Sequence, residues 1–425
     1  MSISLKARHA GGQPIGDLMA RALGDPTLIS LAAGFVDDVT LPVEIAREAA
    51  AKLLADEGLA RRALQYGTAA GWAPLRQLLW ERALAADGLP ERRSQSFENV
   101  VCTAGSNQIL ALASEAVLDP GDIVLCASPT YFVYLGTLKA IGAVAWGVET
   151  DEYGIVPEAL EEAFLHFRRH GDFGRVRMIY DVSYFDNPRG ISQSAERRGR
   201  LVEIVRKWSE EEKIYLLEDA AYRELRYDGD DVPTIWSHDE AGEHVILAGT
   251  FSKSFSPGVR VGYGILPADL VLPTLDLKGN LDFGSPHLNQ LLMYEVLTSG
   301  RYDTHVAALR DAYRVKRDAM LRTADEHFAG VPGVSWIAPE GGLYVWLTLP
   351  PELPTVMDGD LFQACVERGV LYVPGDLCFP EAGVPTGESS MRLSFGVCSE
   401  ARIAEGMKKL ADAVIDTAAT APPTA

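Results

Sequence analysis

The chain is poor in cysteine, and its few cysteines form no pattern that would bind a metal or build a disulfide framework. The five cysteines are scattered along 425 residues, no two of them make a CxxC pair, and the eight histidines include no HExxH motif. This excludes the ligand spacings of common zinc sites and the regular pairing of small secreted domains. We therefore expect no metal site, and we expect buried, unpaired thiols in a reducing compartment. The cysteines are Cys102, Cys126, Cys365, Cys378 and Cys398.

Long apolar runs and an excess of positive charge are also missing. No run is long enough to span a bilayer, and residues 1–12 contain no apolar stretch of the signal-peptide type. The formal net charge is −20, from 39 lysines and arginines against 59 aspartates and glutamates. Such a surface repels phosphate backbones, so we expect no nucleic acid and no membrane among the partners. We expect a cytoplasmic protein.

The composition is otherwise that of a globular protein with a core of normal size. Hydrophobic residues make up 47% and charged residues 23% of the chain, whose length suits two or three domains. Between about residues 41 and 300, short apolar runs alternate with helical stretches. This order indicates right-handed crossovers and an α/β fold with a mainly parallel central sheet sandwiched by helices, in which ligands bind at the carboxyl ends of the strands. The strand-like runs are 99–103, 123–126, 143–148, 176–180, 214–217 and 245–248, and the helical stretches include 108–118, 157–167 and 195–211.

The pattern changes after residue 300. A long helical stretch over 301–328 leads into a mixed region, and the last helix, which begins after the N-cap residue Ser399, has apolar residues at spacings of 4, 3 and 4. We therefore expect a second, smaller α+β domain. Its strand-like runs are 333–337, 343–347 and 391–394. The predicted divisions are an N-terminal arm (1–40), a large ligand-binding domain (41–300), a small C-terminal domain (301–417) and a frayed tail (418–425).

A lysine among small hydroxyl residues follows the last strand-like run of the large domain. The stretch reads Gly-Thr-Phe-Ser-Lys-Ser-Phe-Ser-Pro-Gly-Val-Arg over 249–260. Thr250 and Ser252 can donate hydrogen bonds to a phosphate, and Arg260 can bind one with its planar guanidinium. A lone lysine of this kind usually belongs to a surface loop. The arginine at this spacing is what favours a binding site around Lys253.

Three other polar stretches follow predicted strands, and some have an ordinary explanation when taken alone. Asp219, in Leu-Glu-Asp-Ala-Ala-Tyr, ends a strand and could be a helix N-cap. Asn187-Pro188 is a turn signal. Gly105-Ser106-Asn107 lies between a strand and a helix, where free N–H groups and the positive end of the helix make an anion site.

In this order and spacing, the stretches resemble the class I/II aminotransferases of fold type I, which use pyridoxal 5′-phosphate (PLP). The family has an S-K pair before a PGxRxG turn, a D-x-x-Y stretch, an NPTG turn and a G-S-Q stretch, each with a counterpart here. The pattern is most similar to that of the 2-aminoadipate and aromatic types, and the likeness spans residues 31–410. The resemblance implies PLP fold type I, PLP as the cofactor, an amino acid as the small-molecule substrate, and a homodimer with shared active sites.

The resemblance also implies cofactor roles for individual residues. Lys253 would hold PLP as a Schiff base, the internal aldimine, and would act as general base and acid. Asp219 would keep the pyridine nitrogen protonated, and Tyr222 and Asn187 would bind the phenolic oxygen. Tyr131 would stack on the ring, although an aromatic residue there could equally belong to the core. The phosphate would be bound by Gly105, Ser106, Asn107, Thr250, Ser252 and Arg260.

Roles toward the substrate and a second subunit follow from the same resemblance. Arg392 matches the arginine that binds the substrate α-carboxylate, with Gly34 and Asn187 beside it. Without the family match, an arginine that alternates with apolar residues in a strand is a solvent-facing position. Tyr66, in a Gln-Tyr-Gly stretch, matches the tyrosine that reaches the phosphate of the neighbouring subunit's cofactor.

Several residues depart from the family pattern near the expected site. The turn that usually reads P-x-x-Q-N-P-T-G has Ser183, Asp186 and Arg189 at the positions of proline, glutamine and threonine. Gly16 stands where 2-aminoadipate relatives often have arginine. Asp186 and Asp181 could be solvated loop residues, or they could form an acidic rim that attracts a cationic substrate. We expect neutral or cationic amino acids to be better substrates than acidic ones, unless Arg189 turns into the pocket and binds a second carboxylate.

The leading hypothesis is an aminotransferase that moves the α-amino group of an amino acid to a 2-oxo acid. The alternative is a non-transaminating PLP enzyme of specialised metabolism, which catalyses elimination, replacement, carbon–carbon bond formation or oxidation on a cationic or S-adenosylmethionine-like substrate. A PLP-sensing transcription regulator is not expected, because the roughly forty residues before the large domain are too few for a DNA-binding winged helix.

Overall fold

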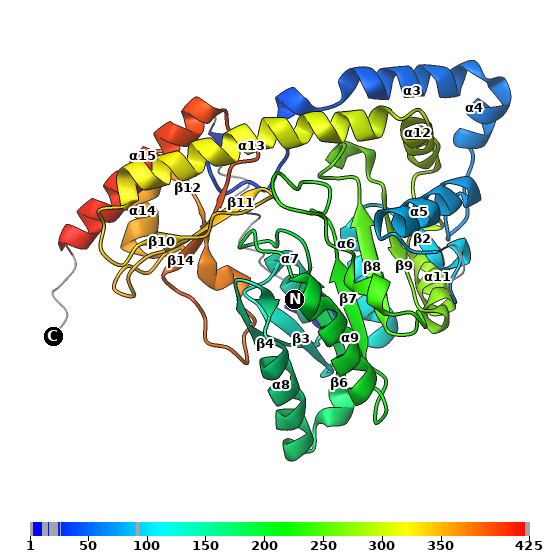
Figure 1. Cartoon of the computed structure of the whole chain (residues 1–425), viewed down its shortest axis with the longest axis horizontal. Helices are drawn as coiled ribbons and strands as arrows, with labels where there is room; N and C mark the ends of the chain where they lie inside the picture. The colour runs from blue at the N-terminus through cyan, green and yellow to red at the C-terminus, as the bar shows by residue number, and fades with distance from the viewer. Residues whose placement is uncertain (1–2, 11–15, 17–23, 26, 91–93, 421–425) are drawn as a thin grey trace.

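The central feature of the computed structural model is an eight-stranded sheet (Figure 1). The structure describes residues 3–10, 16, 24–25, 27–90 and 94–420. The strand order is β2-β9-β8-β7-β6-β3-β4-β5, in which β8 to β4 run parallel, β9 is antiparallel to both its neighbours, and β5 is antiparallel to β4. The α/β fold with a mainly parallel sheet is therefore as predicted. The strands are β2 (Val100–Thr103), β3 (Ile123–Ser128), β4 (Val144–Asp151), β5 (Gly154–Ile155), β6 (Val176–Val182), β7 (Tyr215–Asp219), β8 (Val245–Thr250) and β9 (Gly262–Ile265).

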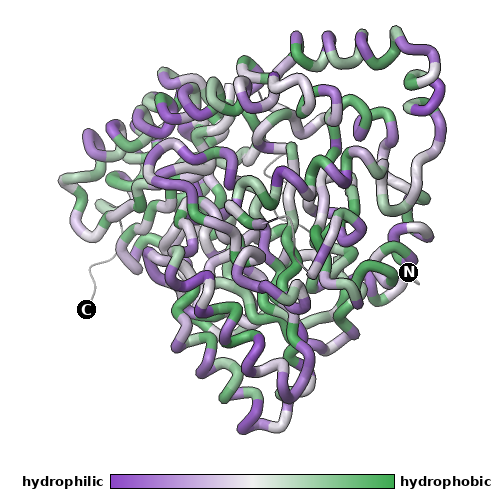
Figure 2. The backbone as a smooth tube through the Cα atoms, turned by 45° about the vertical axis from the view of Figure 1, so that its right-hand side comes forward, coloured by the Kyte–Doolittle hydropathy of each residue, from purple (hydrophilic) through white to green (hydrophobic). Residues whose placement is uncertain are grey.

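Both faces of this sheet are covered and apolar. In β3, Val124 and Cys126 pack in one core, and Ile123 and Leu125 pack in the other, as expected of a parallel sheet between helices. Figure 2 shows hydrophobic segments in the interior and hydrophilic turns along the outer helices. The helices of this part are α3 (Val43–Ala55), α4 (Glu57–Ala63), α5 (Ala73–Ala86), α6 (Ser106–Val117), α7 (Phe132–Ile141), α8 (Pro157–His170), α9 (Ala195–Trp208), α10 (Ile235–His238), α11 (Ala268–Asp282) and α12 (His287–Thr298).

A smaller, four-stranded antiparallel sheet lies beside the large one. Its order is β10-β11-β14-β13, and the 28-residue helix α13 (Arg301–Phe328) runs from the large sheet to the small one (Figure 1). The segment before the large sheet joins this C-terminal part, because β1 (Ile29–Ser30) pairs in parallel with β12 (Val370–Leu371). The remaining elements are α1 (Leu5–His9), β10 (Ser335–Trp336), β11 (Tyr344–Thr348), α14 (Asp360–Glu367), β13 (Val373–Pro374), β14 (Ser390–Ser394) and α15 (Glu400–Thr420).

The predicted strands and helices are present, with boundaries that shift by a few residues. Strand β9 is not predicted by the sequence pattern, because glycines at 262 and 264 leave no apolar run in that four-residue strand. Helix α15 continues through Thr420, so the segment 418–425, expected as a frayed tail, begins inside a helix, and residues 421–425 lie outside the described residues. All five cysteines are unpaired and buried, as expected. Within the described ranges, no helix combines the length and the apolar character that a bilayer crossing requires.

Candidate active site

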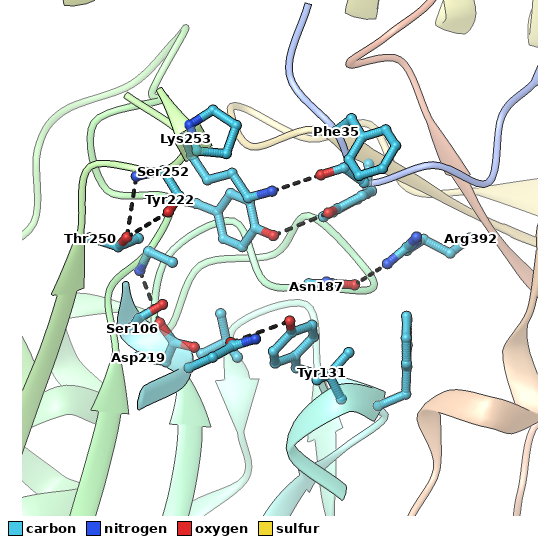
Figure 3. Close-up of a pocket in the computed structure, with 18 of the residues that line it drawn as sticks. Phe35, Ser106, Tyr131, Asn187, Asp219, Tyr222, Thr250, Ser252, Lys253 and Arg392 are labelled. Carbon is cyan, nitrogen blue, oxygen red and sulfur yellow. Dashed lines mark hydrogen bonds between the residues drawn. The ribbon is translucent and has the colours of Figure 1, made fainter. Parts of the chain in front are cut away.

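A cavity of about 310 Å³ lies at the carboxyl ends of β6, β7 and β8 (Figure 3). These strands are parallel neighbours, so the side chains at their ends meet at one edge of the sheet. Strands β11 and β14 of the small sheet contribute Tyr344 and Arg392 to the same cavity. All the predicted site residues line it except Gly105 and Tyr66. Those that do are Gly34, Ser106, Asn107, Tyr131, Asn187, Asp219, Tyr222, Thr250, Ser252, Lys253, Arg260 and Arg392.

Lys253 lies in the turn after β8 and reaches into the cavity (Figure 3). Its Nζ donates a hydrogen bond to the Gly34 carbonyl oxygen at 2.7 Å. Desolvation lowers the pKa of this amine; Tyr344 opposes the effect, and the guanidinium groups of Arg392 and Arg260 add to it. A lowered pKa increases the neutral fraction, and the neutral amine is the form that attacks a carbonyl carbon.

Asp219 is the last residue of β7, and the residue is 4% exposed. It accepts hydrogen bonds from the Tyr180 hydroxyl and the Ala221 N–H, both at 3.2 Å. Burial raises the pKa of Asp219 to about 6, against the opposing effect of the hydrogen bond from Tyr180. A positively charged group beside this carboxylate would stabilise its ionised form. The alternative of a helix N-cap is wrong, because β7 is followed by turns and not by a helix.

The start of α6 forms an anion site. Gly105 is the N-cap of this helix at a φ of 86° and makes no side-chain cap, so the N–H groups at Ser106 and Asn107 are available to a ligand. A Cβ on Gly105 would lie 2.6 Å from Nη2 of Arg260, and a Cβ on Gly262 would lie 2.6 Å from the Gly105 carbonyl carbon. Only glycine fits at both positions. Gly105 therefore shapes the anion site with its backbone, although it does not line the cavity.

Arg260 and two hydroxyl residues complete this anion site. Arg260 donates to the Ala104 carbonyl oxygen at 2.5 Å and to Ser252 Oγ at 3.4 Å. Thr250 donates to the same Ser252 oxygen at 3.0 Å, so both hydroxyls lie close to the guanidinium. Within the described ranges, no carboxylate pairs with Arg260. A doubly charged phosphate would supply the missing negative charge.

Arg392 is buried at the other end of the cavity. It is 1% exposed, which makes the solvent-facing alternative wrong. Its Nη1 donates to Asn187 Oδ1 at 2.8 Å and its Nη2 donates to the Ala32 carbonyl oxygen at 2.7 Å, while Nε has no hydrogen-bond partner among the described residues. The guanidinium lies 4.4 Å from the ring centroid of Tyr344 and 5.2 Å from that of Phe132. A buried guanidinium without a carboxylate partner is a site for an anion.

The residues around Asn187 correct one of the expectations. Asp186 and Arg189 are buried and bind each other, with Arg189 Nη2 at 2.9 Å and Nε at 3.1 Å from Asp186 Oδ2. Arg189 also donates to Thr150 Oγ1 at 2.7 Å, and neither residue lines the cavity. Asp181 is buried as well, and burial, followed by the charge of Asp186, raises its pKa to about 7. Both interpretations of these aspartates, an acidic rim and a solvated loop, are therefore wrong. Arg189 does not turn into the cavity.

Tyr66 lies outside the cavity of its own chain. Its side chain is 80% exposed and packs edge to face on Phe283, with ring centroids 5.5 Å apart. Phe283 is itself 65% exposed. A residue in this position can serve a cofactor only in another subunit.

Seven cavity residues were not predicted from the sequence: Phe35, Phe132, Val133, Val182, Ala221, Pro257 and Tyr344. Phe132 and Val133 begin α7 directly after Tyr131, so their place beside the predicted stacking residue was the available signal. Tyr344 begins β11 and follows Gly341-Gly342-Leu343. Its contact with Arg392 depends on the pairing of β11 with β14, for which the sequence carries no local signal.

The donors around the cavity fit PLP. The anion site at α6 suits the phosphate, Asp219 suits a protonated pyridine nitrogen, and Lys253 suits the aldehyde. Tyr131 forms one wall with a hydroxyl that donates to Asn107 at 3.4 Å, and Figure 3 shows its ring on the opposite side of the cavity from Lys253. These groups come from four separate segments, so the match does not depend on one motif.

Comparisons with known proteins agree with this geometry. A family model described as "Aminotransferase class I and II" matches residues 26–410. Aromatic-amino-acid aminotransferase 1 of Thermococcus litoralis is 34% identical over 91% of this chain and 88% of its own length. The kynurenine aminotransferase of Pyrococcus horikoshii, a crystal structure in complex with PMP, is 30% identical with a TM-score of 0.89 over 98% of this chain and 97% of its own. An α-aminoadipate aminotransferase of Thermus thermophilus, complexed with N-(5′-phosphopyridoxyl)-L-leucine, is 31% identical with a TM-score of 0.84 over 98% of each chain.

Proposed function

Because the chain belongs to the class I and II aminotransferase family and is a PLP-dependent aminotransferase, we propose that it acts on neutral amino acids with aromatic or other apolar side chains. The observation that carries this proposal is the apolar wall of the cavity beside Arg392, formed by Phe35, Phe132, Val133 and Tyr344. Among the described residues, the cations that line the cavity are Lys253, Arg260 and Arg392. This proposal assigns them to the aldehyde, the phosphate and the α-carboxylate, so a second carboxylate would meet no partner.

The surroundings of Asn187 support the same substrate class. Arg189 is bound to Asp186 outside the cavity, so neither charge is available to a substrate side chain. Gly16 offers no side chain of its own. The sequence predicts that neutral or cationic amino acids are the better substrates, and this proposal keeps the neutral ones. Cationic amino acids are not proposed, because that expectation depended on an acidic rim of Asp181 and Asp186, and neither residue lines the cavity.

Within this proposal, the residues of the site have separate tasks. PLP, when bound, supplies an electron sink that weakens the α C–H bond of an attached amino acid. Asp219 keeps a proton at the pyridine nitrogen, and Arg392 holds the α-carboxylate with two of the three N–H donors that Asn187 and Ala32 leave free. The amine of Lys253 takes the proton from the α-carbon and returns it at C4′ of the cofactor. Neither the cavity nor the comparisons favour the elimination, carbon–carbon bond-forming or oxidative alternative.

A panel of amino acids tests the substrate class. We expect phenylalanine and leucine to convert the bound cofactor with a kcat/KM at least about tenfold above that of glutamate or lysine, because an unpaired distal charge costs roughly 1–3 kcal/mol in an apolar wall. The measurement is the single-turnover change in cofactor absorbance at matched concentrations. Faster conversion by glutamate would contradict the proposal.

The proposal includes a homodimer in which Tyr66 serves the cofactor phosphate of the partner subunit. The exposure of Tyr66 and Phe283, and that of Leu272 and Leu281 at 66% each, supports an apolar contact surface in this region. We further propose a cytoplasmic location, for which the buried, unpaired cysteines are the support.

The division of the chain into domains is also part of the proposal. We assign residues 1–40 to an arm, 41–300 to the large PLP-binding domain and 301–417 to the small domain. The two separate sheets support a boundary near residue 300, where α13 begins.

A further inference from the structure

Tyr344 connects the small sheet to the cofactor side of the cavity. It is the first residue of β11, and it is 1% exposed. Its hydroxyl oxygen lies 3.1 Å from that of Tyr222, which follows β7 in the large sheet. The two rings meet edge to face, with centroids 5.8 Å apart and planes at 76°. The hydrogen bond therefore joins elements from the two sheets across the active site.

Space for the Tyr344 hydroxyl is left by a glycine. A Cβ on Gly34 would lie 2.8 Å from the Tyr344 hydroxyl oxygen, closer than a side chain can approach without displacing it. The carbonyl oxygen of the same Gly34 accepts the hydrogen bond from Lys253. The Tyr344 ring also packs under the guanidinium of Arg392. Tyr344 thus touches the tyrosine of the cofactor side with its hydroxyl and the carboxylate-binding arginine with its ring.

The direction of the tyrosine–tyrosine hydrogen bond follows from the number of protons. A phenol has one hydrogen to donate, and burial raises the pKa of Tyr222 well above its ordinary value, so this hydroxyl remains protonated. If Tyr222 donates its hydrogen to the phenolic oxygen of PLP, it can only accept from Tyr344. A hydroxyl that accepts a hydrogen bond becomes a stronger donor.

We infer that Tyr344 is a positioning residue that donates to Tyr222 and thereby strengthens the hydrogen bond from Tyr222 to the phenolic oxygen of PLP. This inference rests on the proposed role of Tyr222. Among the described residues, the titratable and charged groups that face this pair are Tyr131 from the start of α7, Arg392 from β14, Tyr313 from α13, and Lys253, Asp219 and Arg260 from the strand ends of the large sheet.

The test is a pH titration of the absorbance of the bound cofactor in the holoenzyme, which reads the proton affinity at the cofactor directly. A donor at the phenolic oxygen stabilises its anion, so a weaker donor moves proton loss to higher pH. Tyr344→Phe removes only the hydroxyl, and we expect it to raise the titration midpoint by roughly 0.5 to 1 pH unit. Tyr222→Phe should raise the midpoint further, and adding Tyr344→Phe to it should have no additional effect. The KM for the amino acid should stay within about twofold in Tyr344→Phe, because the ring under Arg392 is kept.

Tyr372→Phe is the matched control. Tyr372 is a fully buried tyrosine of the small domain whose hydroxyl donates to the Thr355 carbonyl oxygen at 2.9 Å, away from the cavity. Its loss should lower the thermal midpoint without moving the titration. The inference is overturned if Tyr344→Phe leaves the midpoint unchanged, lowers it, or shifts it equally in the Tyr222→Phe background. If Tyr222→Phe itself shifts nothing, the proposed role of Tyr222 fails as well, and the two failures are thereby distinguished.

Discussion

Removal of the Arg392 guanidinium should weaken the reaction only for substrates that have an α-carboxylate. Arg392 is buried between the rings of Tyr344 and Phe132, donates to Asn187 and Ala32, and has no carboxylate partner among the described residues. A substrate carboxylate would form two charge-assisted hydrogen bonds with it. At roughly 1.5–3 kcal/mol each, they contribute about 3–6 kcal/mol, which corresponds to a factor of about 10² to 10⁴ in kcat/KM.

The assay compares two substrates that differ only in the carboxylate. Phenylalanine and phenethylamine share the ring and the amine, so Arg392→Ala should reduce the rate with phenylalanine by that factor and leave the slow rate with phenethylamine within about threefold. Arg392→Lys keeps the charge but loses the planar fork, and it should lose roughly 10- to 100-fold with phenylalanine. An equal loss with both substrates in Arg392→Ala would refute the reasoning, because the arginine would then act on the fold or the cofactor.

The remaining predictions concern the cofactor, the dimer and the buried charges. Lys253→Ala should abolish the PLP adduct that borohydride fixes; a label on another lysine, mapped by peptide mass spectrometry, would contradict the assignment. Mixing inactive Tyr66→Ala and Lys253→Ala chains should restore roughly a quarter of the wild-type activity, since half of the dimers then contain one native site, and no recovery after verified exchange would place both residues in one subunit. Arg189→Ala should lower the thermal midpoint, because an unpaired buried Asp186 costs roughly 3–5 kcal/mol, without changing the preference for phenylalanine over glutamate; a selective loss of glutamate would give Arg189 a substrate role. Asp219→Asn should make the PLP-free protein more stable than wild type at pH 8. The pKa of Asp219 in the folded protein, about 6, lies above the ordinary value for aspartate, so the wild type loses stability as the pH rises from about 4 through 6. A difference in thermal midpoint between variant and wild type that does not close below pH 5 would contradict this.

The positions of Lys253 and Asp219 could be predicted because each follows an apolar run that ends in the parallel part of the sheet. Parallel neighbours bring their carboxyl ends to one edge, so the order of runs and motifs was enough to place these residues together. Strand β9 could not be found in the same way, since Gly262 and Gly264 give no apolar signal. Their small size matters for a different reason, which is the close approach to Gly105 and Ile109.

The roles of charged and aromatic residues between segments were harder to predict. Asp186 and Arg189 are three residues apart, a spacing that allowed a pair, but the sequence does not tell whether such a pair is exposed or buried. Tyr344 meets Tyr222 only because the two sheets are packed against each other, and that packing is not encoded in any local pattern. The sequence therefore predicted the groups held by single strand ends, and it predicted Arg392 through the family resemblance. It missed Tyr344, whose position depends on the contact between the two sheets.

The half-reaction tests the aminotransferase assignment most directly. The holoenzyme is mixed with phenylalanine in the absence of any 2-oxo acid, and the products are measured together with the cofactor absorbance. We expect one equivalent of phenylpyruvate per subunit, no ammonia, no carbon dioxide and no hydrogen peroxide, with the cofactor converted to its amine form and restored by an added 2-oxo acid. Continuous release of ammonia or peroxide, or a cofactor that an added 2-oxo acid does not restore, would contradict the account.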